Sequence, residues 1–215
     1  MGTLHPKFGS AMTRISNYSE LGSKRLPSHD YSHPGAYFVT ICAARRQCIF
    51  GDIVDGRMRL NKSGLIVAEQ WAGLPSHYAN ASLDEFVIMP NHVHGIICLT
   101  EVDPSSVGAG FQPAHSSPPT NPRHAKPRHG LPEMIRGFKT YSSLGINRLN
   151  GPPGNPVWQR NYYEHVVRTE DDLDRVRRYI VENPLKWAED EENPAVCEMV
   201  EANLGGLETR RYEGG

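Results

Sequence analysis

Two histidines separated by one residue are the first feature of this sequence that could do chemistry. His92 and His94 flank Val93 in an apolar segment. Successive strand residues point to opposite faces, so both imidazoles would share one face while Val93 points into the core. Paired imidazoles can bind a divalent metal at neutral pH. The spacing alone leaves open that they are ordinary polar residues on a strand.

A tyrosine and an asparagine near the end of the chain form the second feature. Tyr179 and Asn183 are four residues apart in a helical pattern, so they share one helix face about one turn apart. That face is offset from the apolar stripe of Leu173, Val176 and Ile180, which predicts a partly exposed Tyr179. A phenolic oxygen can form a covalent link to phosphorus, and an amide oxygen can bind a hard cation. Taken alone, a tyrosine on such a helix is more often part of the core.

The elements that must position these residues come in a mixed order. We expect strands at 36–42, 47–54, 57–60, 83–89, 92–99 and 157–168, and helices at 61–74, 131–149 and 169–183. The strands at 83–89 and 92–99 should pair antiparallel across a turn. Strands and helices do not alternate strictly, so we expect an α+β fold, with a mostly antiparallel sheet and helices packed on it.

Helix boundaries and buried faces follow from particular residues. Thr169 is a good N-cap, and Pro184 disfavours helix at the residue before it. In the helix at 131–149 we expect one buried stripe, formed by Met134, Ile135, Phe138, Tyr141 and Leu144.

Charge and composition divide the chain into three parts. We expect a flexible basic arm at 1–30, one domain at 31–187 and an acidic tail at 188–215. The segment 101–130 is rich in Pro, Ser, Gly and His, which predicts a disordered insertion. The net charge is −1, but residues 188–215 carry −6, which leaves +5 on the remainder. A basic body is compatible with a nucleic-acid partner, and the tail is either a solvated segment or an arm that covers a basic site.

The remaining composition bears on location. The four cysteines form no CxxC pair, and we expect buried free thiols in a reducing cytosol. No apolar run approaches the roughly 20 residues of a membrane span, and the first residues carry no secretory signal. We therefore expect a cytoplasmic protein with no membrane partner.

Several motifs together resemble the HUH single-tyrosine transposases, and most closely the REP-associated tyrosine transposases. The resemblance runs from about Tyr31 to Trp187. The motifs occur in the family's order: Tyr-Phe-Val-Thr at 37–40, Pro-Asn-His-Val-His at 90–94, Trp-Gln-x-x-x-x-Glu-His at 158–165 and Tyr-Ile-x-x-Asn-Pro at 179–184. Each motif alone is modest, whereas their order is specific.

The resemblance implies a fold, a reaction and its ligands. The fold would be a ferredoxin-like or RRM-like HUH nuclease core, with the tyrosine helix packed beside the sheet. His92, His94 and Asn183 would bind a divalent metal, Mg²⁺ or Mn²⁺. Tyr179 would attack a phosphate of single-stranded or hairpin DNA, giving a 5′-phosphotyrosine and a free 3′-OH. The family also allows a homodimer.

Candidate DNA contacts are basic residues at strand and helix edges. Arg45, Arg46, Lys139 and Arg160 could hold phosphates, which would position DNA without reading its sequence. Aromatic residues between 158 and 163 could stack on unpaired bases.

Two other functions remain open. A non-catalytic single-strand nucleic-acid-binding protein would keep the basic and aromatic residues without the histidines and the tyrosine. A metal hydrolase would use the histidine pair to activate water, but it usually needs further carboxylate or histidine ligands.

Overall fold

An antiparallel sheet forms the centre of the protein in the computed structural model, which describes residues 30–101, 129–150, 155–190 and 192–196. The sheet has four strands in the order β4-β5-β1-β6. They are β1 (Gly35–Cys42), β4 (Ala81–Ile88), β5 (His92–Leu99) and β6 (Tyr163–Val167). All neighbours pair antiparallel, so the expected α+β class is confirmed.

Other predicted segments have mixed outcomes. The hairpin expected around residues 55 and 56 is present, with β2 (Gly51–Val54) and β3 (Arg57–Leu60). The last strand is shorter than the expected 157–168, because Trp158 makes only an isolated bridge to Ala43. Nearly all of the expected arm 1–30 and insertion 101–130, and most of the tail 188–215, lie outside the described residues.

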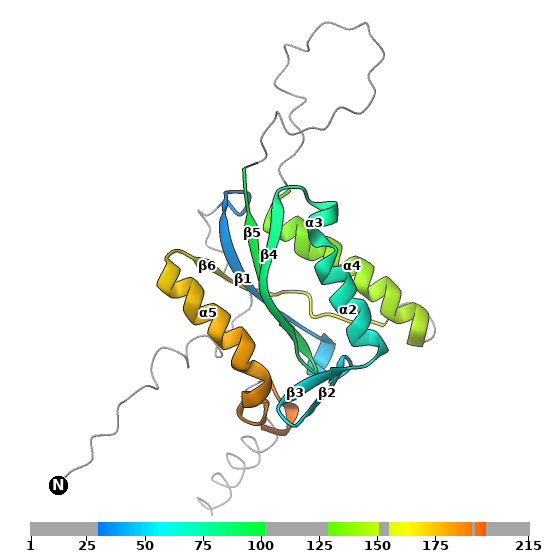
Figure 1. Cartoon of the computed structure of the whole chain (residues 1–215). Coiled ribbons are helices and arrows are strands. Elements are labelled where there is room, and N and C mark those ends of the chain that lie inside the picture. The colour runs from blue at the N-terminus through cyan, green and yellow to red at the C-terminus, as the bar shows by residue number, and fades with distance from the viewer. Residues whose placement is uncertain (1–29, 102–128, 151–154, 191, 197–215) are drawn as a thin grey trace, which may run out of the picture.

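Helices cover both faces of the sheet (Figure 1). One face carries α2 (Lys62–Ala72), α3 (Leu74–His77) and α4 (Leu131–Asn150). The other face carries α5 (Glu170–Glu182), which continues into the 3-10 helix η4 (Asn183–Glu189). A short 3-10 turn, η1 (Ala44–Arg46), follows β1. None of the helices in the described part of the chain is long and apolar enough to cross a membrane.

Strand alternation divides the buried side chains into two clusters. The larger cluster lies beneath α2 and α4 and includes Val39 and Val93. The smaller cluster joins Phe38 and Ile96 of the sheet to Val176 and Ile180 of α5. His92 and His94 lie four and two residues before Ile96 on the same strand, so their side chains point to the same face as Ile96, the face covered by α5.

The buried stripe of α4 differs from the prediction in its second half. Phe138 is buried, but Tyr141 is 60% exposed and Leu144 is 49% exposed. Ser142 and Ile146 are buried in their place, because steps of four residues from Phe138 keep to the helix side that faces the sheet. The Ser142 hydroxyl is satisfied there, since it donates to the Phe138 carbonyl at 2.6 Å.

Close packing against β5, the strand that carries the two histidines, explains why residue 95 is a glycine. A Cβ atom on Gly95 would lie 2.3 Å from Cζ2 of Trp71, whose side chain is fully buried. Only a residue without a side chain lets the indole lie directly against β5 at this position. The α2 side of the sheet is therefore fixed immediately beside His94.

The orientation of α5 is fixed at three places. Thr169 caps the helix as predicted, because its hydroxyl accepts a hydrogen bond from the Asp172 amide at 3.1 Å. Arg177 donates from Nε and Nη2 to the two carboxylate oxygens of Asp84 on β4, at 2.9 and 2.7 Å. Together with the buried Val176 and Ile180, these contacts leave Tyr179 on the side facing β5.

The cysteines only partly match the expected buried thiols. Cys42, Cys48 and Cys98 are free. Cys42 is buried and Cys98 is half-buried, but the expectation is wrong for Cys48, which is exposed on the segment between η1 and β2. Cys197 lies outside the described residues.

Candidate active site between the sheet and the tyrosine helix

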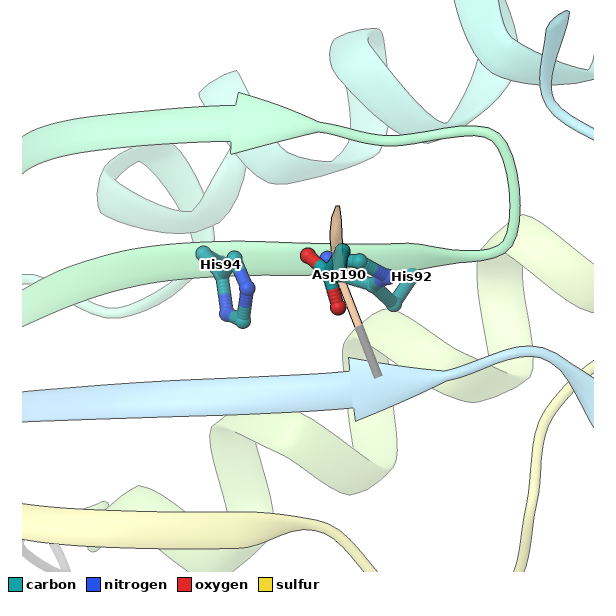
Figure 2. A group of neighbouring side chains, drawn as sticks. All are labelled: His92, His94 and Asp190. Carbon is teal, nitrogen blue, oxygen red and sulfur yellow. The ribbon is translucent and has the colours of Figure 1, made fainter. Parts of the chain in front are cut away.

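The two histidines of β5 lie side by side on the face that α5 covers. His92 is 0% exposed and His94 is 2% exposed, and their ring centroids are 4.4 Å apart. Val93 points to the opposite core, as predicted. Figure 2 shows both rings projecting from β5, with the side chain of Asp190 beside them.

His94 connects the sheet to the tyrosine. Its Nδ1 lies 2.8 Å from the hydroxyl of Thr40, its partner in the β1–β5 register. Its Nε2 lies 3.3 Å from the Tyr179 hydroxyl. The Phe38 ring packs against both rings, with centroid separations of 5.5 Å to His94 and 6.0 Å to Tyr179. The predicted tyrosine and histidine are therefore in direct contact.

The hydrogen bonds of Asn91 fix the tautomer of His92. The Asn91 amide nitrogen donates to the carbonyls of Arg46 at 3.0 Å and Glu192 at 2.6 Å. Its oxygen therefore faces His92 Nδ1, at 2.8 Å. An amide oxygen can only accept, so Nδ1 carries the proton and Nε2 keeps the lone pair that a metal needs.

Two buried polar atoms in this site have no hydrogen-bond partner among the described residues, His92 Nε2 and Asn183 Oδ1. Asn183 is only 3% exposed. The pKa of His92 is lowered to about 3, mainly by burial and also by the nearby Arg46, while the Asn183 amide acts in the opposite direction. Unpaired buried polar atoms are costly, and a cation is one partner that would satisfy both.

Asp190 adds a carboxylate that the sequence did not single out. The ligand atoms of His92, His94 and Asp190 all lie within 4.8 Å of one another. Asp190 directly follows η4, in the segment that we expected to be part of an acidic tail. Nitrogen from two imidazoles and oxygen from a carboxylate and an amide form a donor set that suits Mn²⁺ or Mg²⁺. The residues present therefore fit the expected divalent metal.

Tyr179 is half-buried, and its surroundings favour the neutral phenol. Burial raises the pKa of Tyr179, and the carboxylates of Asp190 and Glu192 raise it further. The Asn183 side chain acts against them. Without an added positive charge, the hydroxyl therefore stays protonated at neutral pH.

Glu192 lies over the end of β1, next to the histidines. This residue is 6% exposed, and its side chain accepts from Cys42 Sγ at 3.6 Å. Its Oε2 lies 3.1 Å from Nε of Arg46. One of the cations predicted to hold DNA is therefore paired with a carboxylate from the acidic segment. The adjacent Arg45 is exposed, with a left-handed φ of 55°.

The two other predicted DNA contacts lie beside α4. The Lys139 ammonium donates to the carbonyls of Gln159 and Asn161, both at 2.9 Å, and to that of Arg160 at 3.4 Å. Burial lowers the pKa of Lys139 to about 8. Lys139 thus holds the 159–161 turn, and the Arg160 side chain is exposed on that turn. DNA contact by these residues stays a prediction.

The fold and the site define a class of α+β protein in which two strand histidines face a helix tyrosine. No family model matches the chain. A Haemophilus influenzae protein described as uncharacterized is 35% identical over 172 residues, which span 79% of this chain and 91% of that protein. The chain belongs to the family of this protein.

Two solved structures are similar to the chain. One is a REP-associated tyrosine transposase bound to a REP hairpin, with 17% identity and a TM-score of 0.48, covering 75% of this chain and 73% of that one. The other is a candidate transposase from Deinococcus radiodurans, with 15% identity and a TM-score of 0.40, covering 75% of this chain and 97% of that one. The sequence identity and the TM-score are low in both comparisons, so the function proposed below rests on the residues of the site itself.

Proposed function

We propose that this protein is a metal-dependent transposase that cleaves and rejoins single-stranded or hairpin DNA through Tyr179. The observation that carries the proposal is the contact between the Tyr179 hydroxyl and His94 Nε2 at 3.3 Å. Beside it lie Nε2 of His92 and Oδ1 of Asn183, for which the described part of the chain offers no hydrogen-bond partner. A nucleophile and a set of metal ligands thus meet in one buried place. The order of the sequence motifs supports the same family.

In the proposed reaction, Tyr179 Oη attacks the phosphorus of a phosphodiester. The bond from phosphorus to the 3′ oxygen breaks, the 5′ phosphate stays on the tyrosine, and the phenolic proton is balanced by the proton gained at the free 3′-OH. The covalent link conserves the phosphodiester bond for rejoining to a second 3′-OH. Catalysis of phosphoryl transfer depends mainly on positioning and charge stabilisation.

The protein's own residues would supply the positioning. The α5 contacts hold Tyr179 over β5, and Phe38 limits the movement of its ring. His92, His94 and Asp190 would hold the cation, and Asn183 is within reach of the same place. A bound divalent cation would polarise the scissile phosphate and favour the phenolate, whose formation the protein alone disfavours.

An adduct assay tests the proposal. Labelled hairpin DNAs with unpaired flanks of randomised sequence would be mixed with the protein in Mn²⁺ or in chelator. We expect a denaturation-resistant, Mn²⁺-dependent adduct that is lost in Tyr179→Phe. Tyr141→Phe is the matched control, because Tyr141 is 60% exposed on α4, on the other side of the sheet.

The possible outcomes separate the candidate functions. Tight binding of the hairpins without any adduct would favour the non-catalytic nucleic-acid-binding protein. An adduct that survives in Tyr179→Phe would identify another tyrosine as the nucleophile. Metal-dependent strand cutting that leaves no protein-linked product would favour a hydrolase.

A further inference from the structure

A cleft of about 570 Å³ lies between α4 and the chain that leads into β6. Its lining includes Pro132, Ile135, Arg136, Arg160 and Tyr162. The volume is in the usual range for small-ligand sites, roughly 300–1,000 Å³. The cleft is on the α4 side of the sheet, whereas Tyr179 is on the α5 side, so it is separate from the site described above.

The cleft combines an apolar wall with positive charge. Ile135 is 1% exposed and Tyr162 is 9% exposed, so these side chains form a fixed wall. Arg136 and Arg160 are exposed, and neither forms an ion pair within the described ranges. Glu133 is the single carboxylate among the lining residues described, and it lies 2.8 Å from His129 Nδ1. Guanidinium groups bind phosphate in a bidentate manner.

Lys139 makes one side of the cleft rigid. Its ammonium binds the carbonyls of the 159–161 turn and lies 5.5 Å from the centroid of the Tyr162 ring. Because its donors are directed to the backbone, Lys139 serves to hold Arg160 and Tyr162 in place. The phosphate-binding groups left in the cleft are therefore Arg136 and Arg160.

The same turn connects the cleft to the end of β1. The Gln159 amide donates to the Cys42 carbonyl at 2.9 Å, and Cys42 is paired with His92 in the sheet register. Lys139 and Cys42 are also close enough for each to affect the pKa of the other. A strand that leaves the cleft across this turn would therefore reach the histidines around the end of β1.

We infer that this cleft binds an unpaired nucleotide of the DNA substrate, away from the scissile phosphate. Its base would lie against Pro132 and Tyr162, with the buried Ile135 packed behind them, and the phosphates on either side of it would be held by Arg136 and Arg160. A volume of about 570 Å³ fits a single nucleotide, so the site would favour the single-stranded part of the DNA. This inference rests on the proposed function for the identity of the ligand.

The test measures binding of a single strand with no hairpin. The probe is fluorescent oligothymidylate about 15 nucleotides long, within the usual site sizes of single-strand binders. Anisotropy titrations would compare the wild type with the Arg136→Ala/Arg160→Ala variant. Arg148→Ala is the matched control, because Arg148 is also an exposed arginine on α4 but does not line the cleft.

We expect the double variant to bind oligothymidylate about tenfold more weakly. The slope of log affinity against log salt should become shallower by about 1.4, the loss of two single-strand phosphate contacts. Arg148→Ala should match the wild type, and binding of a duplex of the same length should not depend on the two arginines. Oligothymidylate that contains 4-thiothymidine should crosslink to the Pro132 or Tyr162 peptides.

Several outcomes would overturn the inference: no binding of oligothymidylate by the wild type, an equal loss in Arg148→Ala, or an equal loss for the duplex. The adduct assay is scored separately. Oligothymidylate binding that depends on the two arginines, without any Tyr179 adduct, would support the nucleotide-binding role of the cleft and reject the cleavage reaction. A Tyr179 adduct together with unchanged oligothymidylate binding by the double variant would support the cleavage reaction and reject the nucleotide-binding role of the cleft.

Discussion

The Tyr179 hydroxyl lies 3.3 Å from the one nitrogen of His94 that Thr40 does not occupy. Nε2 of His94 can therefore interact with the phenol or with a cation, but not with both. The nucleophile and the metal consequently compete for one atom in this structure. This arrangement and the residues around it determine how the protein should bind metal, respond to pH and bind DNA.

Removing the competing hydroxyl should strengthen metal binding. We expect Tyr179→Phe to bind Mn²⁺ several-fold more tightly in the absence of DNA, because one hydrogen bond contributes about 1 kcal/mol. Calorimetric titration of the metal-free protein would measure this. Weaker binding in Tyr179→Phe would mean that the phenol is itself a ligand.

Asn183 and Asp190 should differ in their contribution to metal binding. An oxygen of the Asp190 carboxylate lies within 4.8 Å of a ring nitrogen of each histidine, and the charge of Asp190 raises the pKa of Tyr179. We expect Asp190→Asn to weaken Mn²⁺ binding about tenfold or more, and to move the pH profile of adduct formation at saturating Mn²⁺ to lower pH. Glu189→Gln, an exposed change in the same segment, is the control. A larger loss in Asn183→Ala would make the amide the principal oxygen ligand.

Asn91 should act on the metal through His92. Replacing it with alanine removes the acceptor that fixes the proton on His92 Nδ1, so we expect about 10–100-fold weaker Mn²⁺ binding. Asn147→Ala on α4 controls for loss of an amide elsewhere. Unchanged metal affinity in Asn91→Ala, with the fold intact by circular dichroism, would show that strand packing alone orients the ring.

Stability should depend on pH through the two histidines. The folded-state pKa of His92 is about 3, below the usual 6.5, and burial also lowers the pKa of His94. As the pH falls below about 6.5, the unfolded chain binds protons that the folded chain excludes. The free energy of unfolding should therefore fall as the pH decreases through this window, by about 1 kcal/mol per histidine per pH unit.

Urea unfolding in chelator at pH 7 and pH 5 would measure this dependence. A His92→Gln/His94→Gln variant should show a smaller difference between the two pH values. An identical difference would assign the dependence to other groups.

Glu192 should lower the affinity for DNA. Its carboxylate pairs with Arg46, so Glu192→Gln should free this cation and increase the affinity for single-stranded DNA several-fold at low salt. Glu189→Gln removes the same charge from an exposed position nearby. If the two changes increase the DNA affinity equally, Glu192 acts only by long-range repulsion of DNA and its pairing with Arg46 has no effect. Unchanged DNA affinity after deletion of the residues beyond 189 would exclude a covering role for the acidic segment.

Local periodicity predicted the parts of the site that lie in one element or in the residue that directly follows it. Strand alternation placed His92 and His94 on one face of β5, and helical spacing placed Tyr179 of α5 near Asn183, the first residue of η4. Asp190 could not be predicted in this way, because its position depends on a 3-10 turn that returns the chain to the sheet. Its only sequence signal was an acidic residue shortly after the helix.

Contacts between distant segments explain the remaining differences. Lys139 had the sequence context of an exposed cation, but the 159–161 turn, about 20 residues away in sequence, surrounds its ammonium with carbonyls. The predicted buried stripe of α4 continued from Phe138 in steps of three residues, whereas the residues that the helix buries against the sheet follow in steps of four. In both cases the deciding partner lies in another element.

The two hydrogen bonds donated by Asn91 join the turn after β1 to the segment that contains Glu192. If that segment leaves the sheet, one amide proton of Asn91 loses its acceptor, and only the hydrogen bond to the Arg46 carbonyl still holds the amide in its orientation. If that bond is also broken, the amide can rotate by half a turn, present its NH₂ group to His92 and move the imidazole proton from Nδ1 to Nε2. The ring nitrogens of His92, observed by ¹⁵N NMR, would then report whether the C-terminal segment is docked.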